Sequence, residues 1–403
     1  MSKRWKAAAV ICEYNPFHMG HQYHLEETRR ISGAEYVIAV MSGNFVQRGE
    51  PAIADKWLRT EMALRGGADL VVELPAAYAL SSAQYFASGA VDLICKMSVV
   101  THLSFGSEAF GGEGGAAELE RFALRTPHGP ELDRGSLRGG RSYAAAAHRP
   151  GVAAPNDVLG AEYIRALHRH ASEIRPITVT RKGSAHDQPG SAGHIRSLIG
   201  SASSAAEQAS WKALMPETAA NLLEKEMKTG KSPVLSEHFD QTVLAALRFL
   251  GAEGLRSCPF VAEGLEYKIY SAACSATSFE TLIRACTSLR YTASRIRRIV
   301  FAAILGITRE MIKMPAPYIR ILGMNRGCGP LMDALTERSC VPVITSKAKF
   351  LKSAADLPET APAKLFLRTE NRAAELYALG YPAQDQRIGC SELTHPLIYV
   401  SLP

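Results

Sequence analysis

The sequence predicts an α/β protein built on a doubly wound parallel sheet, followed by a mainly helical region and a short C-terminal α/β segment. Three observations predict this class. Over the first 200 residues, short β-rich apolar runs alternate with helical patterns, as in βαβ units. From 203 to about 314 the pattern is helical. After Pro315 and Pro317 a second, shorter α/β pattern begins.

Five strands and three crossover helices are expected in the N-terminal part. The strands are predicted at 7–12, 36–41, 69–74, 99–105 and 174–180. The helices are predicted at 20–31, 55–65 and 81–96, where Gly, Ser or Asp marks each start. Between 111 and 154 the composition shifts to Gly, Ala and Arg, which favours helices joined by mobile loops.

The rest of the chain has weaker boundaries. A strand at 318–322, a helix at 329–338 and a strand at 341–345 are expected after the helical region. This segment either returns to the main sheet or forms a small appended lobe, and the pattern does not distinguish the two. The predicted domains are 1–202, 203–314 and 315–403.

Composition excludes several classes of protein. With 403 residues, 47% hydrophobic and 21% charged, the chain is globular rather than disordered. The apolar runs are far shorter than the roughly 20 residues of a membrane span, and Glu13 and Pro16 interrupt any secretory signal, so a cytoplasmic location is expected. The eight cysteines have no zinc-site spacing. A net charge of +7 is compatible with a polyanionic partner.

The most informative segment runs from Glu13 to His21, directly after the first predicted strand. Its His18-Met19-Gly20-His21 motif opens the first helix, where open α/β sheets bind ligands. Two imidazoles can stabilise charge on a leaving pyrophosphate, and Gly20 lets a nucleotide approach the backbone. The alternative is that both His residues line an ordinary loop. The strand-HxGH-helix arrangement resembles the nucleotidylyltransferase superfamily, which implies a Rossmann-like sheet of that type.

A second stretch supports this resemblance. The string SAGHIR at 191–196 resembles the Ser-x-x-x-Ile-Arg segment that opens a helix under the triphosphate in that superfamily. Ser191 and Arg196 are therefore phosphate candidates. A capping Ser and a solvated Arg would be the ordinary structural explanation.

Further strings are similar to the tRNA(Met) cytidine acetate ligase family. They are SGNFVQRGEP (42–51), DKW (55–57), GADLVVELP (67–75), FGSE (105–108), PNDVLG (155–160), EY (162–163) and RKG (181–183). The resemblance is dense from 7 to 200 and continues in patches to about 350. Two departures, Ser184-Ala185-His186-Asp187 and His194, affect the loops expected near the phosphates.

This resemblance implies an activity. Such enzymes use ATP to convert acetate to acetyl-adenylate, release pyrophosphate, and pass the acetyl group to N4 of the wobble cytidine of elongator tRNA(Met). Residues 1–202 would then be the ATP-binding catalytic domain. His18 and His21 would be catalytic, and the ATP-binding residues would be Ile11, Cys12, Glu13, Tyr14, Asn15, Pro16, Phe17, His18, Met19, Gly20, His21, Gln22, Tyr23, His24, Gly106, Asn156, Arg181 and Lys182.

Two additional cations and one metal complete the expected site. Lys56 and Arg48 are further candidates for phosphate or carboxylate contact, although each is equally compatible with a solvated surface charge. Mg²⁺ is expected to accompany ATP because it neutralises the triphosphate. No carboxylate cluster indicates a metal site supplied by the protein itself.

A basic stretch in the helical region is the candidate tRNA contact. Residues 281–320 contain eight Lys or Arg and one acid, Glu310, which suits a polyphosphate backbone. The candidates within the string RYTASRIRR are Arg290, Tyr291, Arg295, Arg297 and Arg298. A solvated basic helix face is the alternative. Two other functions share part of the evidence: a nucleotidylyltransferase that adenylylates a small metabolite, and a non-catalytic RNA-binding protein.

Overall fold

The computed structural model describes residues 6–125, 154–181, 190–201 and 205–401. The five predicted N-terminal strands are confirmed within about two residues, and they lie in one mostly parallel sheet. The strand order is β10-β8-β5-β2-β1-β6-β7, with the short β9 beside β8. The strands are β1 (Ala7–Cys12), β2 (Tyr36–Ser42), β5 (Leu70–Leu74), β6 (Val100–Ser107), β7 (Arg175–Thr180), β8 (Ile319–Asn325), β9 (Val343–Ile344) and β10 (Ile398–Val400).

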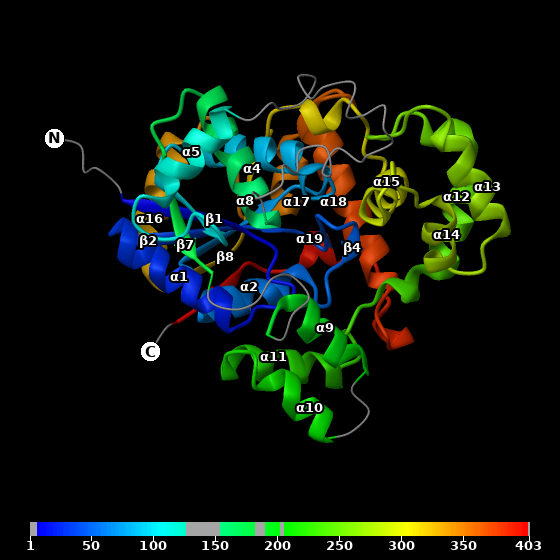
Figure 1. Ribbon diagram of the computed structural model, residues 1–403, viewed down its shortest axis with the longest axis horizontal. Helices are drawn as coiled ribbons and strands as arrows, with labels where there is room; N and C mark the ends of the chain where they lie inside the picture. Colours follow the sequence, from blue (N-terminus) through cyan, green and yellow to red (C-terminus); the bar gives the residue numbers. More distant parts are fainter. Residues whose placement is uncertain (1–5, 126–153, 182–189, 202–204, 402–403) are drawn as a thin grey trace.

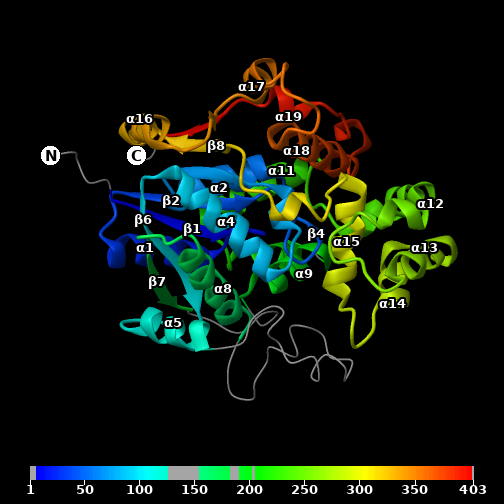
Figure 2. The ribbon, with the colours of Figure 1, turned by 90° about the horizontal axis from the view of Figure 1, so that it is seen from above.

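Helices cover both faces of this sheet, as the predicted doubly wound fold requires (Figures 1 and 2). Alternate strand residues enter two separate cores, with Ala9 and Val40 in one and Val10 and Met41 in the other. Covering helices from the N-terminal half are α1 (Met19–Ser32), α2 (Lys56–Arg65), α3 (Ala76–Ala79), α4 (Ala83–Met97), α5 (Gly115–Arg125) and α8 (Pro155–Arg169). Of the Gly- and Ala-rich stretch predicted at 111–154, residues 126–153 lie outside the described residues.

The predicted helical region separates into two parts in space. The helices α9 (Ala192–Ser201), α10 (Ala205–Lys212) and α11 (Glu217–Lys228) lie below the sheet in Figure 1, where α11 packs against α2 and α10 against α9. A second group forms a lobe at the right of that view: α12 (Asp240–Leu255), α13 (Leu265–Ser275), α14 (Phe279–Cys286) and α15 (Ala293–Leu305). The three-domain division of the chain stays a prediction.

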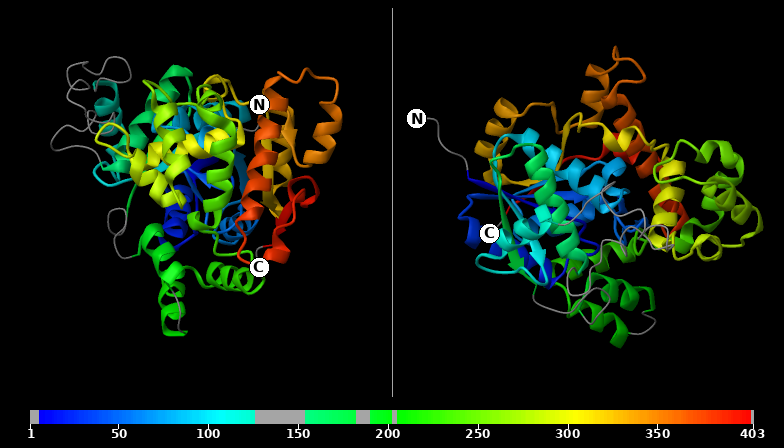
Figure 3. Two further views of the ribbon diagram at one scale, coloured as in Figure 1. Left: turned by 90° about the vertical axis from the view of Figure 1, so that its right-hand side faces the viewer. Right: turned by 45° about the horizontal axis from the view of Figure 1, so that its top comes forward.

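The C-terminal segment returns to the main sheet, which settles the alternative that the sequence left open. Strand β8 pairs antiparallel with β5, and β10 pairs parallel with β8 at the sheet edge. Its helices lie together on one side of the molecule (Figure 3). They are α16 (Gly329–Arg338), α17 (Lys347–Ser353), α18 (Pro362–Leu379) and α19 (Ser391–Thr394).

A short hairpin projects from the carboxyl end of β2 and was not predicted. It consists of β3 (Phe45–Val46) and β4 (Glu50–Pro51), paired antiparallel. The segment that follows is tied to α18, because the hydroxyl of Tyr377 donates to the Ala52 carbonyl at 2.7 Å. Among the described residues, no helix combines the length and apolar character that crossing a membrane requires.

Candidate functional site

The loop between β1 and α1 lies where the strand order reverses, since β1 has β2 on one side and β6 on the other. This is the position at which doubly wound sheets bind ligands. The buried Arg59 guanidinium donates to the Glu13 carbonyl at 2.6 Å and to the Ser42 carbonyl at 3.1 Å. The Asn15 side chain accepts a hydrogen bond from the Ile53 amide at 2.7 Å. The loop is therefore fixed from the side of α2 and the hairpin.

The HxGH spacing makes His18 the cap of α1 and stacks the two imidazoles. The Nδ1 atom of His18 accepts from the Gly20 amide at 3.0 Å, and Nδ1 of His21 accepts from the His18 amide at 3.3 Å. The ring centroids lie 3.8 Å apart. Because each Nδ1 is an acceptor, the neutral rings carry their proton on Nε2. Both side chains thus present an Nε2–H donor, which is what binding a phosphate oxygen requires.

Gly20 has a structural role in addition to the predicted one, which stays a prediction. A Cβ atom at this position would lie 2.9 Å from Cε1 of His18. The missing side chain therefore leaves space for the imidazole of the cap rather than only for a nucleotide.

The three histidines of α1 are held in the neutral form. Burial lowers the pKa of His18 to about 4, and the positive charge of Arg181 contributes. The same two causes lower the pKa of His24 to about 4. Burial, together with His18, His24 and Arg181, lowers the pKa of His21. Nε2 of His24 lies 3.1 Å from the hydroxyl of Ser104 on β6, which ties the helix to the neighbouring strand.

The carboxyl end of β6 brings together three of the predicted ATP-site residues. A Cβ at Gly106 would lie only 3.1 Å from the Arg181 side chain, so the absence of a side chain at Gly106 leaves room for this arginine. Nε of Arg181 lies 3.6 Å from Glu108 Oε1, which also accepts from the Asn156 amide at 2.5 Å. The sequence prediction did not include Glu108, although its place in the FGSE string was a signal. Lys182 lies outside the described residues.

Helix α9 brings Arg196 to the same loop. Its Nη1 donates to the Asn15 carbonyl at 2.7 Å, and its Nη2 lies 3.9 Å from Glu50 Oε2 on the hairpin. The Ser191 hydroxyl accepts from the His194 amide at 3.2 Å, which is a helix-capping contact. Ser191 thus lies at the start of α9, and Arg196 lies beside the HxGH loop.

Several other predicted ATP-site side chains line or support the loop. Tyr14 is buried with its ring centroid 4.9 Å from that of His21, and Phe17 is fully buried beneath Gly66. Burial raises the pKa of Glu13, whose carboxylate accepts from the Gln47 amide at 2.7 Å, while Arg196, Arg59 and Arg48 oppose that shift. The remaining predicted positions lie on β1, in the loop or on α1, and they are Ile11, Cys12, Pro16, Met19, Gln22 and Tyr23.

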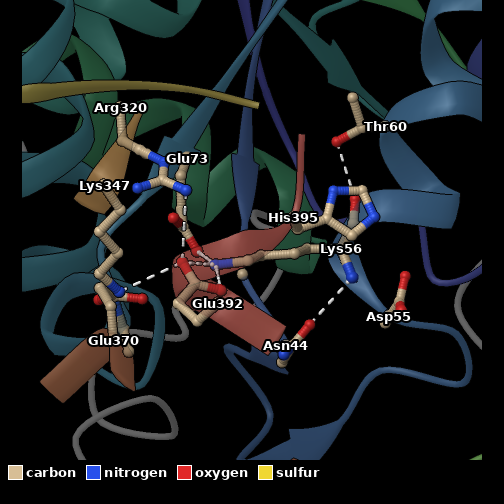
Figure 4. Close-up of polar contacts among 12 residues, drawn as sticks. Asn44, Asp55, Lys56, Thr60, Glu73, Arg320, Lys347, Glu370, Glu392 and His395 are labelled. Carbon is tan, nitrogen blue, oxygen red and sulfur yellow. Dashed lines mark hydrogen bonds and ion pairs between the residues drawn. The ribbon is translucent and has the colours of Figure 1, made fainter. Parts of the chain in front are cut away.

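The prediction that Lys56 contacts phosphate is wrong for this structure. Lys56 is buried, and its ammonium lies 2.6 Å from Glu73 and 2.8 Å from Glu392 (Figure 4). A cation that is paired with two carboxylates inside the protein does not reach a ligand. Arg48 is half-buried in the turn of the hairpin, and its proposed contact with phosphate stays a prediction.

The five predicted tRNA residues lie at and before the start of α15. Arg290 is exposed and paired with Glu263, and the Arg295 guanidinium lies 4.9 Å above the Tyr291 ring. Arg297 pairs with Glu50 and Glu280, each at 3.2 Å.

Arg298 faces the hairpin rather than solvent. Its Nη1 donates to the Gln47 carbonyl at 3.0 Å, and burial, with Arg295 nearby, lowers its pKa to about 10. The basic stretch is therefore not a simple solvated face, because several of its guanidiniums contact the hairpin or the neighbouring loops.

Across the described ranges, no group of three or more His, Cys, Asp or Glu side chains is arranged to hold a metal ion.

Comparison with known proteins gives consistent matches over nearly the whole chain. The model of the HIGH Nucleotidyl Transferase family matches residues 5–391. The tRNA(Met) cytidine acetate ligase of Acetivibrio thermocellus is 36% identical, with 98% of this chain and 99% of the relative covered. The enzyme of that name from Caldanaerobacter subterraneus is also 36% identical at the same coverage. The crystal structure of Thermotoga maritima TmcAL bound with alpha-thio ATP superposes with a TM-score of 0.88 at 30% identity, covering 98% of this chain and 100% of that one.

Proposed function

Since the chain belongs to the HIGH nucleotidyl transferase family, and within it to the tRNA(Met) cytidine acetate ligases, we propose that it is an ATP-dependent ligase that acetylates N4 of the wobble cytidine of elongator tRNA(Met). An acetate oxygen attacks the α-phosphorus of ATP and pyrophosphate leaves, which gives acetyl-adenylate. The cytidine amine then attacks the acetyl carbon, AMP leaves, and the amine gives up a proton.

The observation that carries this proposal is that Nδ1 of both His18 and His21 accepts a backbone amide hydrogen, which leaves Nε2–H of each neutral ring to donate to a ligand. Nucleotidyl transfer asks the protein mainly for positioning and for donors aimed at the leaving phosphate. Neutral rings fixed by backbone hydrogen bonds meet that requirement without reorganising. The start of α1 adds its partial positive charge at the same place.

The nearby cations extend this site. Arg181 lies beside Glu108 at the end of β6, and Arg196 donates to the Asn15 carbonyl of the HxGH loop. Both are suited to pair with phosphate oxygens, while Gly106 and Asn156 are suited to the nucleoside. ATP binding is further supported by the nucleotide-bound relative from Thermotoga maritima. Mg²⁺ would arrive with ATP and be held through the phosphates. The described residues offer no three-ligand protein site for it.

The tRNA would lie against the start of α15. Arg290, Arg295 and Arg297 are suited to RNA phosphates, and Tyr291 to a base of the anticodon loop. Arg298 would support this surface from beneath through its contact with Gln47. The wobble cytidine is unpaired in its loop, so its amine is accessible without opening a helix.

The test uses labelled acetate, ATP and elongator tRNA(Met). We expect labelled N4-acetylcytidine in the tRNA and release of pyrophosphate. Replacing both imidazoles, in His18→Ala/His21→Ala, should reduce both products by a factor of at least about 100. The control is His168→Ala, which removes an exposed His in the last turn of α8 that is paired with Glu120, and it should leave activity unchanged. An acid-labile adenylate of a different compound, without acetylcytidine, would contradict the proposal.

A further inference from the structure

The hairpin β3–β4 lies between the residues proposed for ATP and those proposed for tRNA, and Glu50 contacts both sets. Oε1 of Glu50 lies 3.2 Å from Nη1 of Arg297 on α15. Its Oε2 lies 3.9 Å from Nη2 of Arg196 on α9. One carboxylate is thus shared between two guanidiniums that come from different parts of the chain.

The backbone around Glu50 is fixed, so only its side chain is free to change partner. A Cβ on Gly49 would lie 2.4 Å from the Arg298 amide nitrogen, which shows how closely the turn is seated on α15. Arg298 donates to the Gln47 carbonyl, and the Gln47 amide donates to Glu13. The hairpin therefore joins α15 to the HxGH loop as a rigid connection.

We propose that Glu50 makes the binding of ATP and of tRNA mutually antagonistic. This inference rests on the proposed function, because it needs a phosphate partner for each arginine. When a triphosphate engages Arg196, the Glu50 carboxylate is left to Arg297 and neutralises it, so RNA binds more weakly. When an RNA phosphate engages Arg297, the carboxylate turns to Arg196 and weakens triphosphate binding.

This antagonism would make acetyl-adenylate formation precede tRNA binding and acetyl transfer. Before activation, the triphosphate holds Arg196 and the tRNA surface is partly neutralised. Once pyrophosphate leaves, Arg196 is again available to Glu50, and Arg297 is released for RNA. The tRNA is therefore favoured after the adenylate has formed.

The experiment measures tRNA affinity with and without a non-hydrolysable ATP analogue. For the wild-type enzyme we expect the analogue to weaken tRNA binding about fivefold, and tRNA to weaken analogue binding by the same factor, since coupling is reciprocal. In Glu50→Gln the analogue should change tRNA affinity by less than about twofold. The matched control is Glu280→Gln, which frees the other side of Arg297 but does not approach Arg196. It should tighten tRNA binding and keep the fivefold coupling.

A second variant tests the same idea from the other side. In Arg297→Gln, Glu50 has only Arg196 as a partner, so the analogue should bind more weakly than to the wild type even without tRNA. Coupling that survives in Glu50→Gln, or analogue affinity that is unchanged in Arg297→Gln, overturns the inference while leaving the proposed function intact. Absence of tRNA binding to the wild-type protein would instead count against the proposed function.

Discussion

At the scale of single residues, two backbone hydrogen bonds decide what His18 and His21 present to a ligand. Each Nδ1 accepts an amide hydrogen, so the proton of each neutral ring is expected on Nε2. Imidazole ¹⁵N spectra of the labelled protein at neutral pH should show Nε2 protonated and Nδ1 unprotonated in both rings. A spectrum with Nδ1 protonated in either ring would contradict the role proposed for the pair.

The neutral histidines also predict how stability depends on pH. The folded-state pKa of His18 and of His24 is about 4, below the ordinary value of 6.5. Between these values the unfolded chain binds protons that the folded chain does not. The contribution of these two rings to the free energy of unfolding should therefore be constant above pH 6.5 and fall towards pH 4, by up to about 1.4 kcal/mol per pH unit for each ring.

Urea denaturation across this range measures the effect. The variant His24→Gln keeps a partner for the Ser104 hydroxyl but cannot titrate, so its stability should fall less steeply with acid. Equal slopes for variant and wild type would show that His24 does not contribute. The comparison with the variant is needed because burial and Glu73 raise the pKa of Glu370 to about 8, so this group stabilises the fold as the pH falls and opposes the histidine effect in the wild type and the variant alike.

At the scale of elements, a substitution at the start of α1 should affect activity much more than stability. In Gly20→Ala, the added Cβ would meet the His18 ring at 2.9 Å and displace it. Alanine also stabilises a helix relative to glycine by about 0.5–1 kcal/mol. Displacing the ring also removes its cap contact with the Gly20 amide, which opposes the gain from alanine. We therefore expect pyrophosphate release to fall at least about tenfold while the free energy of unfolding changes by no more than about 1 kcal/mol.

Gly200→Ala is the control for this prediction. It places the same methyl group on α9, where nothing lies within 4 Å of the added atom. It should retain full activity. If Gly20→Ala is also fully active, the His18 ring tolerates the shift and its position is not critical.

The elements were predictable where local pattern decides them. The central strands are buried on both faces and read as continuous apolar runs, so their positions followed from the sequence. The antiparallel entry of β8 beside β5 did not, because the choice of neighbour depends on contacts some 250 residues apart. Glu50 and Arg59 were missed for the same reason, since their partners lie on other segments.

Lys56 shows the opposite error. From its place in the DKW string (55–57) it was a candidate for a ligand contact, but its partner Glu392 lies 336 positions away in the sequence. Local pattern identifies a charge at a helix start. It does not reveal that a distant segment covers that charge.

At the scale of the whole molecule, a buried group of charges joins the C-terminal segment to the N-terminal sheet (Figure 4). Lys56 on α2 lies between Glu73 on β5 and Glu392 on α19. Lys347 and Arg320 approach the same Glu392 carboxylate at 3.2 and 3.6 Å. These side chains are all buried, so each charge depends on the others for its stability.

Removing one member of this group should therefore destabilise the fold far more than removing a surface pair. In Lys56→Met, Glu73 loses its ammonium partner and Glu392 keeps only Lys347 and Arg320, with a cost of about 3–5 kcal/mol in the free energy of unfolding. The control is Arg30→Met, which breaks the exposed pair with Glu27 and should change the free energy of unfolding far less than Lys56→Met does. Chemical denaturation measures the free energy of unfolding of both variants.

If this group of charges attaches the C-terminal segment to the sheet, Lys56→Met should also make residues 341–401 more susceptible to limited proteolysis than the parallel strands. A cost for Lys56→Met that matches the surface control would show that packing of β8 and α18, rather than these charges, holds the two parts together.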